Sequence, residues 1–216
     1  MTPYCRIYVA CLASYNAGIL HGTWIDANQD ADAIRAEVRA MLKSSPCPNV
    51  TRQDFECAEC SHKWTRDISP YQHIPSACPE CGHTTLIHGT PYPSAEEFAI
   101  HDHEGFGNLV GEYTGIDEVV QLAEAIEEHG DKYTGLRSYG FDHDEAMEKL
   151  EESYQGCFDS LEDWAEQFLD DTGAFSGAPD MLKTYFDFER YARDAELSGD
   201  ILEIEGDKGK HVFWNH

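Results

Sequence analysis

Lysine and arginine are scarce in this sequence of 216 residues. The chain has 15 of them against 41 aspartates and glutamates, which gives a formal net charge of −26 at pH 7. A protein that binds nucleic acid through its phosphates needs a basic surface. We therefore expect no nucleic acid among the partners of this protein.

Long apolar runs are also missing. No stretch approaches the roughly 18 apolar residues that a membrane span requires, so we expect no membrane association. The first residues, MTPYCRIYVACLASYN, lack a basic segment followed by a long apolar core, and we expect no signal peptide. These two absences together predict a cytoplasmic protein.

Motifs of common enzyme classes are absent as well. The sequence has no glycine-rich phosphate loop, no H-E-x-x-H and no G-x-S-x-G. The stretch HDHE contains His101 and His103, which would share one face of a strand but would need a third ligand from elsewhere to hold a metal ion. We predict that the protein is not an enzyme, and we keep a metal-dependent hydrolase as a third hypothesis.

The residues that are present indicate a folded protein with unevenly distributed charge. Hydrophobic residues make up 41% of the chain and aromatic residues 12%, well above the content of a disordered acidic tail. Residues 1–90 contain nine acids and seven bases, whereas residues 91–216 contain 32 acids and eight bases. Nearly all the negative charge thus belongs to the C-terminal portion.

Short strands and helices follow one another along the chain. In the N-terminal half we expect strands at 6–12 and 22–27, a helix at 31–43 capped by Asp30, and a strand within 96–106. Further along we expect helices at 117–129, 144–153, 161–171, 179–186 and 188–199, a short strand at 154–158, and a closing hairpin of 201–206 with 210–215. This order predicts an α+β fold built from small domains. The predicted parts are an N-terminal α+β domain at 1–53 and 90–108, an insertion at 54–89, a helical middle domain at 109–153, and a C-terminal α+β domain at 154–216.

The stretch SLEDWAEQFLDD has the pattern of an amphipathic helix. Ser160 is a suitable N-cap, and Asp163 three residues later completes a pair that resembles a capping box. The apolar positions are Leu161, Trp164, Ala165, Phe168 and Leu169, at the spacing of one helix face. The five acids of the stretch then lie on the solvent side.

Four of the eight cysteines have the spacing of a metal site. They form C-x2-C-x17-C-x2-C with Cys57, Cys60, Cys78 and Cys81, and four thiolates suit one tetrahedral Zn2+. Four cysteines fill the coordination shell, so we predict one structural zinc ion per chain, which holds a small ribbon at 54–89. His62, His73 and His83 lie nearby in the sequence and could replace a cysteine.

Several stretches also carry a family resemblance. RIYVACLASYNAGILHGTWIDA, EEFAIHDHEGFG, SLEDWAEQFLDDTG and YFDFERYARDAELSGD resemble, in order and character, the ArdA antirestriction proteins. The resemblance covers residues 5–45 and 90–216. It implies an elongated chain of small domains that forms a homodimer through the C-terminal domain. It also implies that the protein acts in a bacterial cytoplasm and is carried by mobile genetic elements.

The resemblance implies a function that the charge pattern supports independently. Carboxylates three or four residues apart on a helix lie within roughly 5–6 Å of each other, close to the spacing of phosphates along a DNA strand. An acidic surface of this kind would mimic B-form DNA and block the DNA-binding groove of a type I restriction-modification enzyme. The candidate mimic residues are Glu124, Glu127, Glu128, Glu148, Glu151, Glu152, Glu162, Asp163, Glu166, Asp170 and Asp171.

The zinc ribbon is a departure from this family, because typical members lack it. The ribbon follows the first predicted helix, where an inserted segment is tolerated. It leaves open a second hypothesis, in which the protein is an acidic adaptor that docks through its ribbon on another basic protein that processes nucleic acid.

Overall fold

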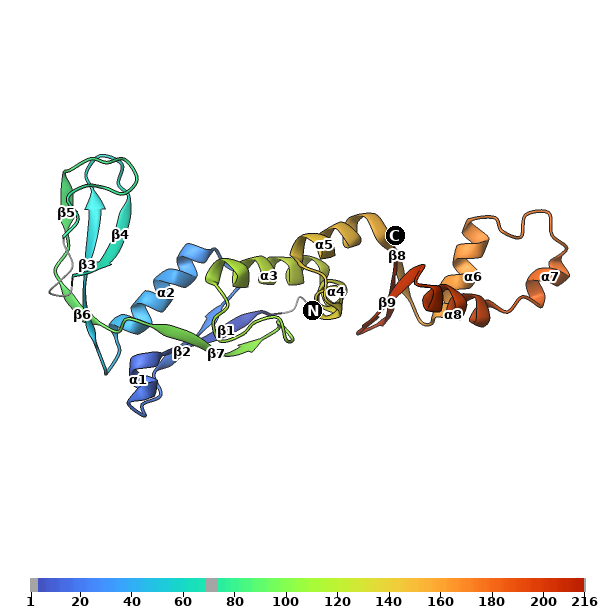
Figure 1. Ribbon diagram of the computed structural model, residues 1–216, viewed down its shortest axis with the longest axis horizontal. Helices are drawn as coiled ribbons and strands as arrows, with labels where there is room; N and C mark the ends of the chain where they lie inside the picture. Colours follow the sequence, from blue (N-terminus) through green and yellow to red (C-terminus); the bar gives the residue numbers. More distant parts are fainter. Residues whose placement is uncertain (1–3, 69–73, 216) are drawn as a thin grey trace. The chain divides into compact units, whose positions relative to one another are not determined.

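The computed structural model describes residues 4–68 and 74–215 (Figure 1). Helices and several small sheets are both present, which confirms the predicted α+β class. The described chain divides into two compact units. One comprises Tyr4–Gly105 and Val110–Ala123, and the other comprises Phe106–Leu109 and the residues from 124 to 215. The finer division into four domains stays a prediction.

The first unit contains a three-stranded antiparallel sheet in the order β2-β1-β7. Its strands are β1 (Arg6–Cys11), β2 (Gly22–Asp26) and β7 (Phe98–Glu104). Between β1 and β2 the chain forms a short helix, α1 (Leu12–Asn16), where we predicted only a turn. The sulfur of Cys11 accepts a hydrogen bond from the N–H of Ser14 at 3.5 Å, which caps this helix.

Helix α2 (Ala31–Lys43) packs against this sheet, and its bounds match the prediction. The side chain of Asp30 caps the helix by accepting a hydrogen bond from the N–H of Ala33 at 3.1 Å. The buried face of α2 carries Ile34, Val38 and Leu42 at a spacing of four residues. A capping residue and an apolar period were therefore enough to predict the helix.

A second sheet of the first unit lies between α2 and β7 in the sequence. Its strands are β3 (Val50–Cys57), β4 (Lys63–Asp67), β5 (Leu86–His88) and β6 (Tyr92–Ser94). Strand β3 is central, because β4, β5 and β6 all pair with it in antiparallel register. The predicted ribbon at 54–89 is part of this sheet, and from here on the ribbon means the segment 50–94.

The second unit contains a three-stranded antiparallel sheet in the order β8-β10-β9. Its strands are β8 (Tyr154–Phe158), β9 (Ile201–Gly206) and β10 (Gly209–Trp214). Strands β9 and β10 form the predicted closing hairpin, in which Gly206 lies opposite Gly209. Helices α6 (Leu161–Asp171) and α8 (Phe188–Ser198) pack against each other and against this sheet, and the short helix α7 (Asp180–Thr184) lies between them in the sequence.

An aromatic cluster forms the core of the second unit. Trp164 is 1% exposed and contacts the rings of Phe168, Tyr191 and Trp214 with centroids 5.5, 6.3 and 5.9 Å away. Ala165, Ala192, Ile201 and Val212 complete the buried centre. The apolar side of α6 therefore packs inward as its sequence pattern predicted.

The helices that lie between β7 and β8 in the sequence differ in part from the prediction. Helix α3 (Ile116–His129) contributes residues to both units, and its predicted start was one residue late. Helix α4 (Asp131–Tyr139) was not predicted. The predicted helix at 144–153 is an α-helix only in α5 (His143–Glu148) and continues as the π-helical segment η1 (Lys149–Ser153).

Helix α4 packs closely on the C-terminal hairpin. A β-carbon on Gly135 would lie 2.0 Å from Cγ2 of Ile204, so only glycine permits this approach. Tyr133 and Leu136 are fully buried. Contacts with residues about 70 positions away thus stabilise a helix that contains glycine at its centre, where glycine is intrinsically unfavourable. None of the helices in the described part of the chain is long and apolar enough to cross a membrane.

Candidate metal centre and acidic surface

Two turns of the same design present the four cysteines of the ribbon. In the first turn the N–H of Cys57 donates to the carbonyl of His62 at 2.9 Å, and the N–H of Ser61 donates to the carbonyl of Cys57 at 3.0 Å. In the second turn Cys78, His83 and Gly82 repeat this pattern at 2.8 and 2.9 Å. Ser61 and Gly82 have φ angles of 57° and 72°, in the left-handed region that glycine adopts without strain.

The four sulfur atoms lie together at the end of β3. Cys57 and Cys81 are 3.6 Å apart, Cys60 and Cys78 are 3.7 Å apart, and all four ligand atoms lie within 4.8 Å of one another. A tetrahedron with metal–sulfur bonds of about 2.3 Å has edges of about 3.8 Å, whereas a disulfide bond is about 2.0 Å long. The geometry therefore fits four thiolate ligands around one metal ion.

Local hydrogen bonds prepare one of these thiols for metal binding. The backbone N–H groups of Cys60 and Glu59 point at the sulfur of Cys57 and lower the pKa of that thiol from 9.0 to about 6. The N–H of His62 alone would lower the pKa of Cys60, but hydrogen bonds with the other cysteines and burial raise it to about 12, and the pKa of Cys81 is raised as well. Metal ions bind the thiolate, so Cys57 is the thiol of this group that is prepared for binding near neutral pH. Cys57 and Cys78 are buried, and Cys60 and Cys81 are exposed. All four ligand positions are protein atoms, which is the arrangement of structural zinc sites.

The neighbouring histidines make other contacts. The ring of His62 stacks on the ring of Trp64 with centroids 5.5 Å apart. His83 accepts a hydrogen bond at Nδ1 from the N–H of Thr85. His73 lies outside the described residues. Within the residues that were described, the four cysteines are the group that could hold a metal ion, and no histidine joins it.

The HDHE stretch forms the end of β7, next to an irregularity in the sheet. Ile100 pairs with Val9 and Asp102 pairs with Tyr8, so the register shifts at His101. The ring of His101 packs edge-on against Tyr15 at 4.7 Å. Among the described residues, neither His101 nor His103 belongs to a group of three or more ligating side chains. The structure offers no third ligand in that part of the chain for the hydrolase hypothesis.

The acidic residues singled out in the sequence are all exposed. Three of them are on α3, one is at the end of α5, two are in η1, and five are on α6. In order along the chain they are Glu124, Glu127, Glu128, Glu148, Glu151, Glu152, Glu162, Asp163, Glu166, Asp170 and Asp171. The π-helical geometry of η1 changes the angular spacing of Glu151 and Glu152 relative to Glu148, so these three side chains do not follow α-helical periodicity.

The N-terminus of α6 is capped as predicted, with one difference. Ser160 Oγ accepts a hydrogen bond from the N–H of Asp163 at 3.1 Å and donates one to the Asp163 carboxylate at 2.6 Å. The acid therefore bonds to the serine hydroxyl, whereas in a capping box it would bond to the serine N–H. Glu162 and Asp163 also lie in the first turn, where the helix dipole favours negative charge.

A lysine that the sequence pattern did not reveal lies against the acidic side of α6. Lys183 of α7 approaches Asp170 at 2.5 Å and Glu166 at 3.9 Å. Its hydrogen bond to Asp170 raises the pKa of Lys183. The two partners are 13 residues apart, and the intervening turn has no periodic pattern from which this contact could be predicted.

A comparison with known protein families gives a match. The model of a family described as "Antirestriction protein (ArdA)" matches residues 7–208, and the matched range includes the ribbon. A search of curated protein sequences found no significant match.

Proposed function

Because the chain belongs to the ArdA family of antirestriction proteins, we propose that it blocks a type I restriction-modification enzyme by occupying the DNA-binding groove of that enzyme. In this role the protein acts in a bacterial cytoplasm and catalyses no reaction. The inhibited groove is basic, and the inhibitor presents carboxylates where DNA presents phosphates.

The observation that carries this proposal is the exposure of all eleven candidate carboxylates on helices. On α6 alone, Glu162, Glu166 and Asp170 are spaced by four residues and recur along one side of the helix. The opposite side packs into the aromatic cluster around Trp164. A rigid core under the helix keeps the charges in place, so the partner does not have to order them on binding.

The negative charge is distributed, and so is its contribution to binding. An exposed ion pair contributes at most about 1 kcal/mol, and salt screens it over about 8–10 Å. Many such pairs formed together give tight but salt-dependent binding. We therefore expect no single carboxylate to be essential.

A displacement experiment tests the proposal. The purified protein is titrated into a type I restriction enzyme already bound to fluorescently labelled duplex DNA, at a series of salt concentrations. We expect release of the DNA, with an inhibitor affinity that falls steeply as salt increases. Failure to release DNA at low salt, with an active enzyme and a folded inhibitor, would contradict mimicry for that target.

The surface of the second unit also supports a homodimer. Apolar side chains of α7 and the residue that follows it face solvent: Met181 is 64% exposed, Leu182 is 55% exposed and Tyr185 is 82% exposed. Apolar side chains that gather at one place on a surface are typical of a protein interface. Replacing Leu182 with glutamate is expected to halve a mass that light scattering would otherwise find near twice 24.3 kDa. The same replacement at Leu20, which is 82% exposed in the other unit, should leave the mass unchanged.

A second candidate function is supported by the surface of the ribbon. Trp64, Phe55 and His88 lie in one row across β4, β3 and β5, and their neighbouring ring centroids are 5.6 and 5.1 Å apart. Trp64 is half-buried and His88 is exposed, so a partner protein can reach both rings. In this account the protein is an adaptor whose activity depends on zinc, and zinc removal distinguishes it from mimicry.

A further inference from the structure

Three of the few cations of this chain line one cavity in the first unit. Six of the 15 lysines and arginines lie between residues 35 and 66. Three of them, Arg35, Arg39 and Arg52, line a single cavity of about 370 Å³. Glu96 is the acid in the same lining, so arginines outnumber acids among the lining residues in a protein whose net charge is −26.

The floor of this cavity is apolar. Val38 and Leu42 of α2, Phe98 of β7 and Ile116 of α3 form it, and Val38, Leu42 and Ile116 are at most 8% exposed. On α2 the lining residues 35, 38, 39 and 42 follow the spacing of one helix face. We call this cavity, with its three arginines and its apolar floor, the arginine pocket.

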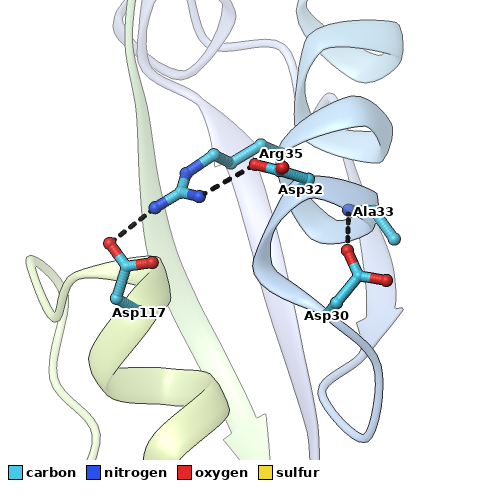
Figure 2. A network of polar contacts seen from close by, with 5 residues as sticks. All are labelled: Asp30, Asp32, Ala33, Arg35 and Asp117. Atoms are coloured by element: carbon cyan, nitrogen blue, oxygen red, sulfur yellow. Dashed lines mark hydrogen bonds and ion pairs between the residues drawn. The ribbon is translucent and has the colours of Figure 1, made fainter.

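Two of the three guanidinium groups are held in place by the protein. Arg35 pairs with Asp32 of the same helix, α2, at 3.1 Å and with Asp117 at the start of α3 at 2.5 Å (Figure 2). Arg52 donates from Nη2 to the backbone carbonyl of Glu96 at 2.9 Å. These contacts fix the positions of the two groups before any ligand binds, while Arg52 keeps further N–H donors unused.

Arg39 differs from the other two. It is exposed, and none of the hydrogen bonds or ion pairs between described residues engages it. Arg39 also lines the two neighbouring cavities on the ribbon side, where Lys63 and Trp64 contribute. A planar guanidinium offers paired donors that match a carboxylate, sulfonate or phosphate group.

We propose that the arginine pocket binds a small organic anion, in which an apolar body covers the floor and one anionic group contacts Arg39 and Arg52. The volume lies at the lower end of the range for small-molecule sites. The net charge of the chain repels anions at long range, so the ligand gains affinity only from close contacts and from burial of apolar surface. Simple inorganic anions lack an apolar body and should bind weakly.

The probe 1-anilinonaphthalene-8-sulfonate has this chemistry, and its fluorescence rises on binding. Titration of the full-length protein at about 150 mM salt is expected to show binding that R39Q weakens about five- to tenfold. R39K, which keeps the charge but loses the paired donors, should lie between wild type and R39Q. R66Q is the matched control, because Arg66 is an exposed arginine of β4 outside the pocket lining, and it should bind the probe like wild type.

A neutral probe of similar shape, N-phenyl-1-naphthylamine, separates charge from burial. We expect R39Q and wild type to bind it equally, because the apolar floor is unchanged. If wild type fails to bind the sulfonate, or if R39Q and R66Q bind it as wild type does, the proposal is wrong. Binding at the exposed apolar residues of α7 would give the latter result.

Discussion

The ribbon and the second unit are stabilised in different ways. In the ribbon, Phe55 is a large buried side chain at 2% exposure, and the four cysteine sulfurs lie within 4.8 Å of one another. In the second unit, Trp164 and the rings around it bury a continuous apolar cluster, and its described residues include no group of metal ligands. The unit that carries most of the negative charge is thus the one with a substantial aromatic core. Repulsion between like charges opposes compaction, and a self-sufficient core offsets it.

The largest effect that separates the two regions should come from removing the metal. On the prediction of one zinc ion per chain, we expect the double variant C60S/C81S to bind no zinc and to lose hydrogen-exchange protection in β3, β4, β5 and β6, because zinc binding contributes about 10–16 kcal/mol to the folding of zinc-finger peptides. Protection in β8, β9, β10 and α6 should remain. Elemental analysis and hydrogen-exchange mass spectrometry measure both results.

C157S is the control for zinc loss. Cys157 is an exposed cysteine of β8 and belongs to no ligand group, so this variant should keep one zinc ion per chain. Inhibition of a restriction enzyme should survive C60S/C81S if the carboxylates act as proposed. Inhibition that disappears together with the zinc would favour the adaptor.

A substitution in the aromatic core should destabilise the second unit. We expect W164A to lower the free energy of unfolding of the second unit by about 3–5 kcal/mol, because a large buried ring is replaced by a cavity. Urea denaturation followed by circular dichroism measures the change. L197A, at a side chain that is 73% exposed, should change the free energy by less than about 0.5 kcal/mol. Loss of zinc from W164A would show that the ribbon depends on the C-terminal core.

Neutralising the acids of α6 should weaken inhibition more modestly. We expect the amide variants of Glu162, Glu166, Asp170 and Asp171, combined in one protein, to raise the concentration needed for half-maximal inhibition on the order of 10- to 100-fold at low salt. Each exposed pair contributes a few tenths of a kcal/mol to about 1 kcal/mol, so the single amides should change it less than about fivefold. A DNA cleavage assay measures the effect.

A second set of four exposed acids provides the charge-matched control. Amides at Glu37, Glu59, Glu80 and Glu97 change the net charge by the same amount in the first unit. This variant should inhibit nearly as well as wild type. Equal loss of inhibition in both sets would indicate a general charge effect and no mimicry by α6.

The smallest expected effect concerns Lys183. K183M removes the internal cation beside Asp170 and Glu166, so the partner enzyme no longer competes with it for these acids. We expect inhibition about two- to fivefold tighter at low salt. K208M makes the same change in charge at an exposed position in the β9–β10 turn and should have a smaller effect. Identical affinities for the two variants would mean that Lys183 does not compete.

Local signals explain which features the sequence predicted. Asp30 and Ser160 cap helices whose apolar residues recur at helical spacing, and these helices have the predicted bounds. The cysteine spacing predicted the ligand group because both turns are only a few residues long. The resemblance to ArdA proteins, drawn from short stretches, is confirmed by the family match.

Contacts between distant residues explain what was missed. Helix α4 forms because Gly135 admits Ile204 and because Asp131 bonds to the hairpin: Asp131 accepts from the N–H of Asp207 at 2.7 Å and lies 3.2 Å from His211. Burial alone would raise the pKa of Asp131, but the Asp207 N–H and His211 lower it. Asp207 and His211 are 76 and 80 residues from Asp131 in the sequence, so no local pattern predicts the helix.

The pairing of β3 with β6 has a consequence for removal of the ribbon. Val50 lies opposite Ser94 and Arg52 lies opposite Tyr92, so the chain enters and leaves the ribbon at neighbouring points. A short turn across this pair would close the same gap, and loop-closure entropy depends only weakly on the length of what is inserted. We therefore expect that replacing residues 51–93 with a short turn would leave the course of the rest of the first unit unchanged.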